Sequence, residues 1–350
     1  MGTVYPGDLD TFPTFVDGQD IIYASHINNP GDSIVAIEQT LGKNPQGDYD
    51  TVKERLDDIT VTSDLYYLLP VSKSDFGGVV RQDAGGAVYE TKLYFGCGTN
   101  GAYYKDWWEY DAYRDLWTQK TDFGGTARQQ IVCGTYLTKI FAGTGFDGAR
   151  LKDWWEYDIG GNSWTQKTDF GGTGRNAAVA CSANSMIYVG LGYDGVDKKD
   201  WWQYDPSLDS WTQKTDFGGV ARRGSAIGLS GGKIYVGLGY DGTHKSDWWE
   251  YDPSLDSWTQ KTDFPGNARR FCGSTGAGTK IFIGAGYSDV FQDDCWEYDT
   301  VADTWTQMVN YAGVAVTSPF ACSFGNKIFM GTGGDGAVYY KDWHFQSYLK

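Results

Sequence analysis

The stretch that decides the fold runs from Trp211 to Gly219 and reads Trp-Thr-Gln-Lys-Thr-Asp-Phe-Gly-Gly. Its segment Thr-Gln-Lys-Thr-Asp-Phe occurs four times, and successive copies stand 47 residues apart. A period of 20 to 50 residues is typical of solenoids, propellers and arrays, so the chain is a repeat protein of six units. The repeated positions are Phe76, Phe123, Phe170, Phe217 and Phe264, followed by Tyr311; Trp117, Trp164, Trp211, Trp258 and Trp305; and Gly-x-Gly pairs at Gly96, Gly143, Gly190, Gly237, Gly284 and Gly331.

One unit, residues 170–216, predicts four short strands. A glycine-rich turn leads into the small, apolar stretch 177–180, and the β-branched and aromatic run 186–192 ends at the turn signal Tyr193-Asp-Gly195. The stretches 200–205 and 210–216 supply the third and fourth strands. Four strands with short connections form an antiparallel meander.

Six such meanders around an axis make a β-propeller, whereas a solenoid needs fewer strands per unit. Adjacent apolar residues such as Trp201 and Trp202 point to opposite faces of a strand, and neighbouring blades cover both faces. We therefore interpret the tryptophan pairs as packing residues rather than a stacking platform for sugars or bases. The Gly-x-Gly pairs are interpreted as positions where the sheets converge toward the axis. The sequence predicts an all-β, six-bladed propeller with 47-residue blades over residues 63–350.

The phase of the repeats predicts how the ring closes. The last unit begins at Tyr311 and has no fourth strand after its third. Residues 65–75 align with the fourth strands of the other units, so they are expected to supply the outer strand of the last blade. Pro70 stands where the other copies have tryptophan, which suits an edge strand.

Residues 1–62 form a different segment. Two short apolar stripes predict small helices, but stripes of this length cannot form a core alone, so we expect self-association or attachment to another protein. The stripes are Ile34, Ile37 and Leu41, and Val52, Leu56 and Ile59.

Charge and composition exclude some classes of function. The formal net charge is −16, and the first sixty residues hold eleven Asp or Glu against three Lys or Arg. Such a chain repels phosphate backbones and anionic lipid, so no nucleic-acid partner and no membrane insertion are expected. No apolar run reaches about 18 residues and no signal peptide is recognisable, which favours synthesis in the cytoplasm. The six cysteines lack metal-ligand spacing and are interpreted as small buried residues, with no metal and no cofactor expected.

The propeller repeats resemble the kelch repeat. The stretch 234–242, Ile-Tyr-Val-Gly-Leu-Gly-Tyr-Asp-Gly, is followed by Trp249, Tyr251 and Trp258, and the Tyr-to-Trp spacing is that of kelch proteins. The glycine doublet of kelch is replaced here by Gly-x-Gly. The resemblance covers roughly residues 63–350 and implies a kelch-type propeller that binds through one end of its ring.

Residues 8–59 are similar to the amino-terminal regions of tailed-phage fibre and appendage proteins. The shared phrases are Asp17-Gly-Gln-Asp20, His26-Ile-Asn28, Ala36-Ile-Glu38 and Leu41-Gly-Lys-Asn-Pro45. This resemblance implies a base that oligomerises or attaches to a virion, with a display module beyond it. It also implies a protein that is made in the host cytoplasm and is located in the virion after lysis.

Candidate binding residues lie in two sets of loops that an antiparallel meander brings to the same end of the ring. The loops joining the fourth strand to the next first strand carry arginines that could circle one mouth of the central channel, and guanidinium groups suit carboxylates, phosphates or acidic sugars. The sixth position is Val316. Alternatively, each arginine pairs with a nearby loop carboxylate, such as Asp122, Asp169 or Asp216, and braces the blades. The candidates are Arg81, Arg128, Arg175, Arg222 and Arg269, with Asp147, Asp194, Asp241 and Asp335 in the loops between second and third strands.

Three functions remain open. The first is a non-enzymatic virion appendage that binds a host-surface glycan or protein through the propeller, and the second is a structural protein-interaction propeller. The third is a carbohydrate-active enzyme of a sialidase-like or oxidase-like kind. A copper oxidase needs more histidine ligands than His26, His244 and His344 offer, and near-identical repeats disfavour one catalytic constellation, so no catalytic residue is assigned.

Overall fold

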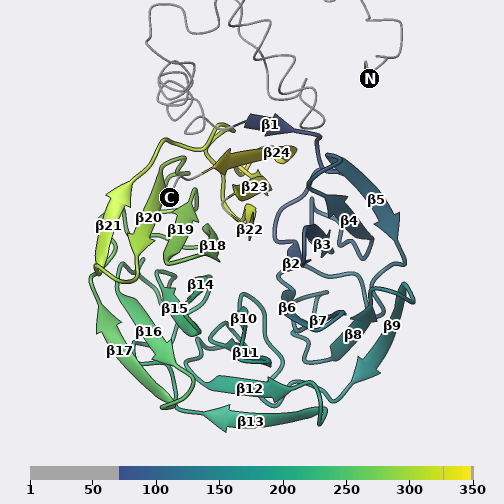
Figure 1. The fold of residues 1–350 in the computed structure, drawn as a ribbon, viewed down its shortest axis with the longest axis horizontal. Coiled ribbons are helices and arrows are strands. Elements are labelled where there is room, and N and C mark those ends of the chain that lie inside the picture. Colours follow the sequence, from purple (N-terminus) through teal and green to yellow (C-terminus); the bar gives the residue numbers. More distant parts are fainter. Residues whose placement is uncertain (1–70, 326, 348–350) are drawn as a thin grey trace, which may run out of the picture. The chain divides into compact units, whose positions relative to one another are not determined.

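The computed structural model describes residues 71–325 and 327–347, which form an all-β, six-bladed propeller. Each blade is a four-stranded antiparallel sheet, and the first strands of neighbouring blades contact one another around the ring. Figure 1 looks down the ring, with the first strands innermost and the fourth strands on the circumference. The predicted fold class is therefore confirmed.

The strands follow the repeat, and the blades are numbered in chain order. Blades 1 to 3 comprise β2 (Gly85–Tyr89), β3 (Lys92–Gly96), β4 (Trp107–Asp111) and β5 (Leu116–Lys120); β6 (Val132–Tyr136), β7 (Lys139–Gly143), β8 (Trp154–Asp158) and β9 (Ser163–Lys167); and β10 (Val179–Ala183), β11 (Met186–Gly190), β12 (Trp201–Asp205) and β13 (Ser210–Lys214). Blades 4 to 6 comprise β14 (Ala226–Ser230), β15 (Lys233–Gly237), β16 (Trp248–Asp252) and β17 (Ser257–Lys261); β18 (Gly273–Ala277), β19 (Lys280–Gly284), β20 (Cys295–Asp299) and β21 (Thr304–Gln307); and β22 (Phe320–Phe324), β23 (Lys327–Gly334), β24 (Tyr339–Ser347) and β1 (Val71–Lys73).

The core lies between the blades. Trp154, at the start of β8, is fully buried, and its ring meets Trp211 of the next blade edge to face at a centroid distance of 5.2 Å. Phe170 meets the same Trp211 at 5.0 Å. Aromatic pairs of this geometry contribute about 0.5–1.5 kcal/mol beyond the area they bury. The first tryptophan of each pair is therefore a packing residue.

The first glycine of each Gly-x-Gly pair is required by the third strand of its own blade. A Cβ on Gly143 would lie 2.3 Å from the Asp153 carbonyl oxygen and 2.4 Å from Cε3 of Trp154. The second glycine, Gly145, has a φ of +99°, which favours glycine. The prediction that the Gly-x-Gly pairs reflect convergence of the sheets toward the axis is therefore wrong.

Polar contacts join the outer strands of adjacent blades. In blade 4, the rings of Tyr251 and Trp258 lie 4.8 Å apart, and the Tyr251 hydroxyl donates to Asp256 at 2.7 Å. Asp256 also accepts the Thr215 backbone N–H of blade 3, and Trp258 Nε1 donates to the Thr215 carbonyl. The same arrangement recurs around the ring, so the Tyr-to-Trp spacing fixes each blade to the one before it.

The ring closes between chain segments far apart in sequence. Strand β1 pairs antiparallel with β24 in the register Val71↔Phe345, and so completes the last blade. This confirms the predicted outer strand for the part that is described. Pro70 and the predicted segment 1–62, with its two helical stripes, lie outside the described residues.

The described residues contain no helix, and hence none long and apolar enough to cross a bilayer. All six cysteines are free thiols; Cys97 and Cys322 are buried and the other four are partly buried.

Candidate functional site

Both sets of candidate loops lie at one end of the ring, which we call the loop face. In blade 2, Gln129 and Phe146 form an isolated bridge, and the Thr126 hydroxyl donates to Asp147 at 2.8 Å. The same bridge recurs at Asn176↔Tyr193 in blade 3. The predicted meeting of the two loop sets is confirmed.

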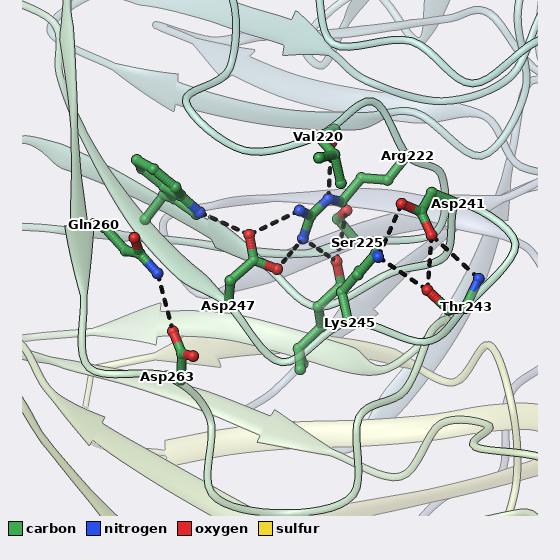
Figure 2. A network of polar contacts seen from close by, with 11 residues as sticks. Val220, Arg222, Ser225, Asp241, Thr243, Lys245, Asp247, Gln260 and Asp263 are labelled. Atoms are coloured by element: carbon green, nitrogen blue, oxygen red, sulfur yellow. Dashed lines mark hydrogen bonds and ion pairs between the residues drawn. The ribbon is translucent and has the colours of Figure 1, made fainter.

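The five repeated arginines lie inside the wall of the ring. Figure 2 shows Arg222, whose two terminal nitrogens donate to the two carboxylate oxygens of Asp247 at 2.5 and 2.7 Å. Its Nε donates to the Val220 carbonyl, and its guanidinium lies 5.0 Å from the centroid of Phe217. All five side chains are at most 1% exposed. Their donors are directed into the protein, which is the bracing arrangement considered as the alternative.

The partner carboxylates differ from those expected. Asp169 and Asp216 approach Lys152 and Lys199 instead, at 3.6 and 3.9 Å. Each arginine pairs with the aspartate that directly precedes the third strand of its own blade. The arginine side chain is buried, and its guanidinium contacts the start of that strand. The partners are Asp106, Asp153, Asp200, Asp247 and Asp294.

Blade 6 replaces this brace. Val316 is buried where the other blades have arginine, and the Tyr311 hydroxyl donates to Asp342 at 2.9 Å. His344 Nε2 lies 2.9 Å from the same oxygen, where tryptophan Nε1 donates in other blades. Tyr311 therefore takes the place of both a phenylalanine and an arginine.

The four candidate loop aspartates are partly buried and cap their own turns. Asp194 accepts the Val196 backbone N–H and the Thr173 hydroxyl, and it lies 2.7 Å from Lys198. These hydrogen bonds outweigh burial and lower the pKa of Asp194 to about 2. Asp147, Asp241 and Asp335 accept backbone N–H groups in the same way.

The repeat changes at the residue that follows each arginine. This position lies in an isolated bridge with the residue after each Gly-x-Gly pair, at the loop end of the first strand. We call these bridged residues the inner rim. Around the ring they are Gln82, Gln129, Asn176, Arg223, Arg270 and Thr317, bridged to Thr99, Phe146, Tyr193, Tyr240, Tyr287 and Gly334.

Arginines and tyrosines alternate along one side of the inner rim. The Arg223 guanidinium lies 4.5 Å from the Tyr193 ring centroid and 5.3 Å from that of Tyr240. Arg270 lies 4.3 Å from Tyr240 and 5.5 Å from Tyr287. Each of the two arginines therefore contacts one tyrosine of its own blade and one of the preceding blade. The sequence of contacts, which we call the arginine–tyrosine ladder, is Arg150, Tyr193, Arg223, Tyr240, Arg270 and Tyr287.

The two inner arginines of the ladder differ in their polar partners. Arg223 donates to Asp197 at 2.9 Å, and burial raises the pKa of Asp197 although the guanidinium opposes that shift. No acceptor among the described residues takes a hydrogen bond from the Arg270 guanidinium, and its Nε is buried. A buried N–H without an acceptor costs about 1–3 kcal/mol. Arg270 therefore carries unused donors and a full positive charge.

A residue with a left-handed backbone directly follows each of the six inner-rim residues that precede a first strand. In the ring order these residues are Asp83, Gln130, Ala177, Gly224, Phe271 and Ser318, with φ between 52° and 62°. Neighbours are joined by backbone hydrogen bonds, such as Phe271 N–H to the Gly224 carbonyl at 2.8 Å. Five are not glycine, and strain of this kind concentrates at functional sites.

Asp83 is the carboxylate of that strained ring. Gln82 donates to it at 3.3 Å. Partial burial raises the pKa of Asp83, and hydrogen bonds from Ser318, Gln130 and Gln82 offset part of that shift. The amide and acidic side chains of blades 1 and 2 thus differ in chemistry from the ladder of blades 2 to 5.

The ladder was not predicted from the sequence, because its residues are not those that repeat in every unit. The available signals were the Arg-Arg pairs at 222–223 and 269–270 and the tyrosines Tyr193, Tyr240 and Tyr287, which stand one period apart. The described residues hold no cluster of three or more metal-ligating side chains.

Comparison with known proteins supports the fold and goes no further. No protein-family model matches the chain, and no curated protein matches it. The solved structure of YjhT is similar over 78% of this chain and 96% of its own, with a TM-score of 0.68 and 15% sequence identity. At this identity the similarity shows the six-bladed propeller architecture alone.

Proposed function

We propose that the propeller is a binding module that recognises a host-surface glycan or protein through its loop face. The observation that carries the proposal is the arginine–tyrosine ladder. Its rings and guanidinium groups are partly exposed at the inner rim, whereas the five brace arginines are buried and hydrogen-bonded. Partly exposed tyrosine and arginine side chains are the residue types that dominate binding energy at interfaces.

The role of residues 1–62 in this proposal is attachment or self-association. It rests on the resemblance of residues 8–59 to phage fibre and appendage proteins, and it makes the protein a virion appendage that displays the propeller. The alternative of a structural, protein-interaction propeller keeps the same loop face but requires no glycan.

A glycan array and a pull-down of host surface proteins, both with the full chain, test the binding proposal. Tyr240→Ala removes one ring from the ladder, and Tyr113→Ala, at a side chain that is 83% exposed on an outer turn, is the matched control. We expect binding that Tyr240→Ala reduces at least tenfold and Tyr113→Ala leaves unchanged, since truncation of a tyrosine that anchors an interface costs about 2 kcal/mol or more. Equal effects of the two variants would refute a site at the ladder.

A carbohydrate-active enzyme is the second candidate, and one observation favours it. An active site needs different residues from different blades. The inner rim and the residues bridged to its aromatic side chains have some of that asymmetry. Asp197 and His244 stand where other blades have Tyr103, Arg150 and Phe291, and arginine follows the brace arginine in blades 4 and 5 alone. His244 Nε2 lies 3.3 Å from Asp289, between the rings of Tyr240 and Tyr287. Turnover of a sialoside or another acidic glycoside by the full chain would establish this alternative.

A further inference from the structure

The Arg270 side chain is the one buried or half-buried arginine in residues 71–325 and 327–347 whose guanidinium has no acceptor. The five brace arginines each hold an aspartate, and Arg223 holds Asp197. Arginine keeps its charge at every physiological pH and presents a planar fork of donors. A charged fork held half-buried without an acceptor is suited to an anion from outside the chain.

The surroundings of Arg270 hold the guanidinium in place without using its donors. It stacks 4.3 Å from the centroid of Tyr240, and Tyr287 and Phe271 lie at 5.5 and 5.7 Å. These rings attract the cation through their faces and leave the edge of the guanidinium plane, where its N–H groups point, for hydrogen bonds. The fork is therefore pre-organised, which reduces the entropy lost on binding a carboxylate, sulfate or phosphate group.

Carboxylates of the chain do not compete for this position. Asp197 is engaged by Arg223 at 2.9 Å. Asp289 lies by His244 and its side chain is 87% exposed, so water solvates it. The neighbouring brace carboxylate, Asp294, is held by both terminal nitrogens of Arg269.

We propose that Arg270 forms the anion subsite of the loop face, with Arg223 as the neighbouring charge, and that its ligand is an acidic saccharide. The oxyanion of the sugar, either a carboxylate or a sulfate ester, accepts hydrogen bonds from the Arg270 fork. The sugar ring lies beside Tyr240 and Tyr287, which are partly exposed and which already hold the arginine guanidinium groups against their rings. This inference rests on the proposed binding function and names the chemistry of its ligand.

The test is a saturation-transfer NMR titration of the full chain at constant ionic strength. The probes are D-glucuronate for the carboxylate, glucose 6-sulfate for the sulfate ester, and D-glucose as the neutral match. The variants are Arg270→Gln, Arg270→Lys and the control Arg114→Gln, which removes the same charge from a side chain that is 79% exposed on an outer turn.

We expect one or both acidic sugars to bind, with glucose at least tenfold weaker. Arg270→Gln should weaken acidic-sugar binding about tenfold or more, because it removes charge-assisted hydrogen bonds. Arg270→Lys should give an intermediate loss, and Arg114→Gln none. Thermal unfolding of each variant checks that it is folded, and if Arg270→Gln is unfolded then Arg270→Lys decides.

Each contrary result has a separate meaning. The anion subsite is overturned if glucose binds as tightly as the acidic sugars or if no acidic sugar binds. It is also overturned if Arg270→Gln and Arg114→Gln bind the acidic sugars with equal affinity. If the glycan array and pull-down still detect partners that Tyr240→Ala weakens, the binding function stands without this subsite. If the full chain binds acidic sugars but no glycan or protein of a host surface, the subsite stands and the display function falls.

Discussion

The guanidinium of Arg270 lies 4.3 Å from the ring centroid of Tyr240, a residue of the preceding blade. This stack joins two blades at their inner ends and leaves the guanidinium without a carboxylate partner. Arg269, the adjacent residue, is buried, and all three of its guanidinium nitrogens donate hydrogen bonds. Two neighbouring arginines therefore have different tasks, since one braces a blade and the other is available for a ligand.

The first prediction concerns the brace. Arg222→Ala leaves Asp247 partly buried without its bidentate partner, so we expect the free energy of unfolding to fall by about 3 kcal/mol. Chemical denaturation of the full chain, followed by tryptophan fluorescence, measures this loss. The control Arg114→Ala should change it by less than about 0.5 kcal/mol. A loss in Arg222→Ala as small as that expected for the control would contradict a stabilising role of the pair.

The second prediction concerns the altered brace of blade 6. Tyr311→Phe removes the hydroxyl that donates to Asp342, so we expect a loss of about 1.5–3 kcal/mol, the range for a hydrogen bond to a charged group. The same denaturation experiment measures it. Adding Val316→Arg to Tyr311→Phe recreates the Phe–Arg pair of the other five blades and should recover part of the loss. A double variant less stable than Tyr311→Phe would indicate that blade 6 cannot accommodate that pair.

The third prediction concerns a cavity of about 40 Å³ between blades 5 and 6. Cys295 lines it at the register position that Trp248 occupies in blade 4, and Met330 fills part of the space. Cys295→Trp alone should destabilise the fold by about 1–3 kcal/mol through overpacking against Met330. Adding Met330→Val, which introduces the residue found at Val236, should raise stability above that of the natural chain by about 0.5–2 kcal/mol.

The thermal unfolding midpoints of the single and double variants test this packing account. A double variant no more stable than the natural chain would mean that the cavity does not reflect the missing tryptophan.

The fourth prediction is an acid-sensitive stability. Burial would raise the pKa of Asp247, but hydrogen bonds from Arg222 and Trp249 outweigh it, and the net direction is downward. The pKa of Asp299 falls to about 2, chiefly through its hydrogen bond from Lys280. A carboxyl group whose pKa is lower in the folded state stabilises the fold at pH values above its unfolded-state pKa of about 3.9. That contribution is lost as the pH falls from about 4 toward about 2, and denaturation at each pH measures it.

Asp83 provides a comparison of opposite sign. Its folded pKa is raised, so ionisation at neutral pH destabilises the fold and protonation relieves this. Asp83→Asn should therefore raise the unfolding midpoint at pH 7, and the gain should shrink as the pH falls toward 4. Asparagine also tolerates the left-handed backbone of this position, whose φ is 57°. A gain that stays constant with pH would contradict the assignment.

The sequence was sufficient to predict the six-bladed architecture because every blade repeats the same strand order and packing contacts. The phenylalanines and tryptophans that recur with the 47-residue period all lie between blades, and the missing fourth strand of the last unit predicted the pairing of β1 with β24. Such features stand at the same position of every unit, so a comparison of the units is enough to predict them.

The site was less predictable because its contacts join residues far apart in the sequence, within one blade for the brace and between blades for the ladder. Arg222 pairs with Asp247, 25 residues away, and not with a nearer loop aspartate such as Asp216. Arg270 meets Tyr240 only when blades 4 and 5 are side by side. The ladder residues also depart from the repeat, so the 47-residue pattern does not mark them.

The most direct test of the central claim is hydrogen exchange of the full chain with and without a bound oligosaccharide of glucuronate. Binding at the ladder should slow exchange at and beside the inner rim, in residues 222–224, 239–245, 269–272 and 286–291. It also predicts that Tyr240→Ala removes this protection and Tyr113→Ala does not. Protection confined to the outer strands, such as β13 and β17, or to the opposite end of the ring would contradict a binding site at the arginine–tyrosine ladder.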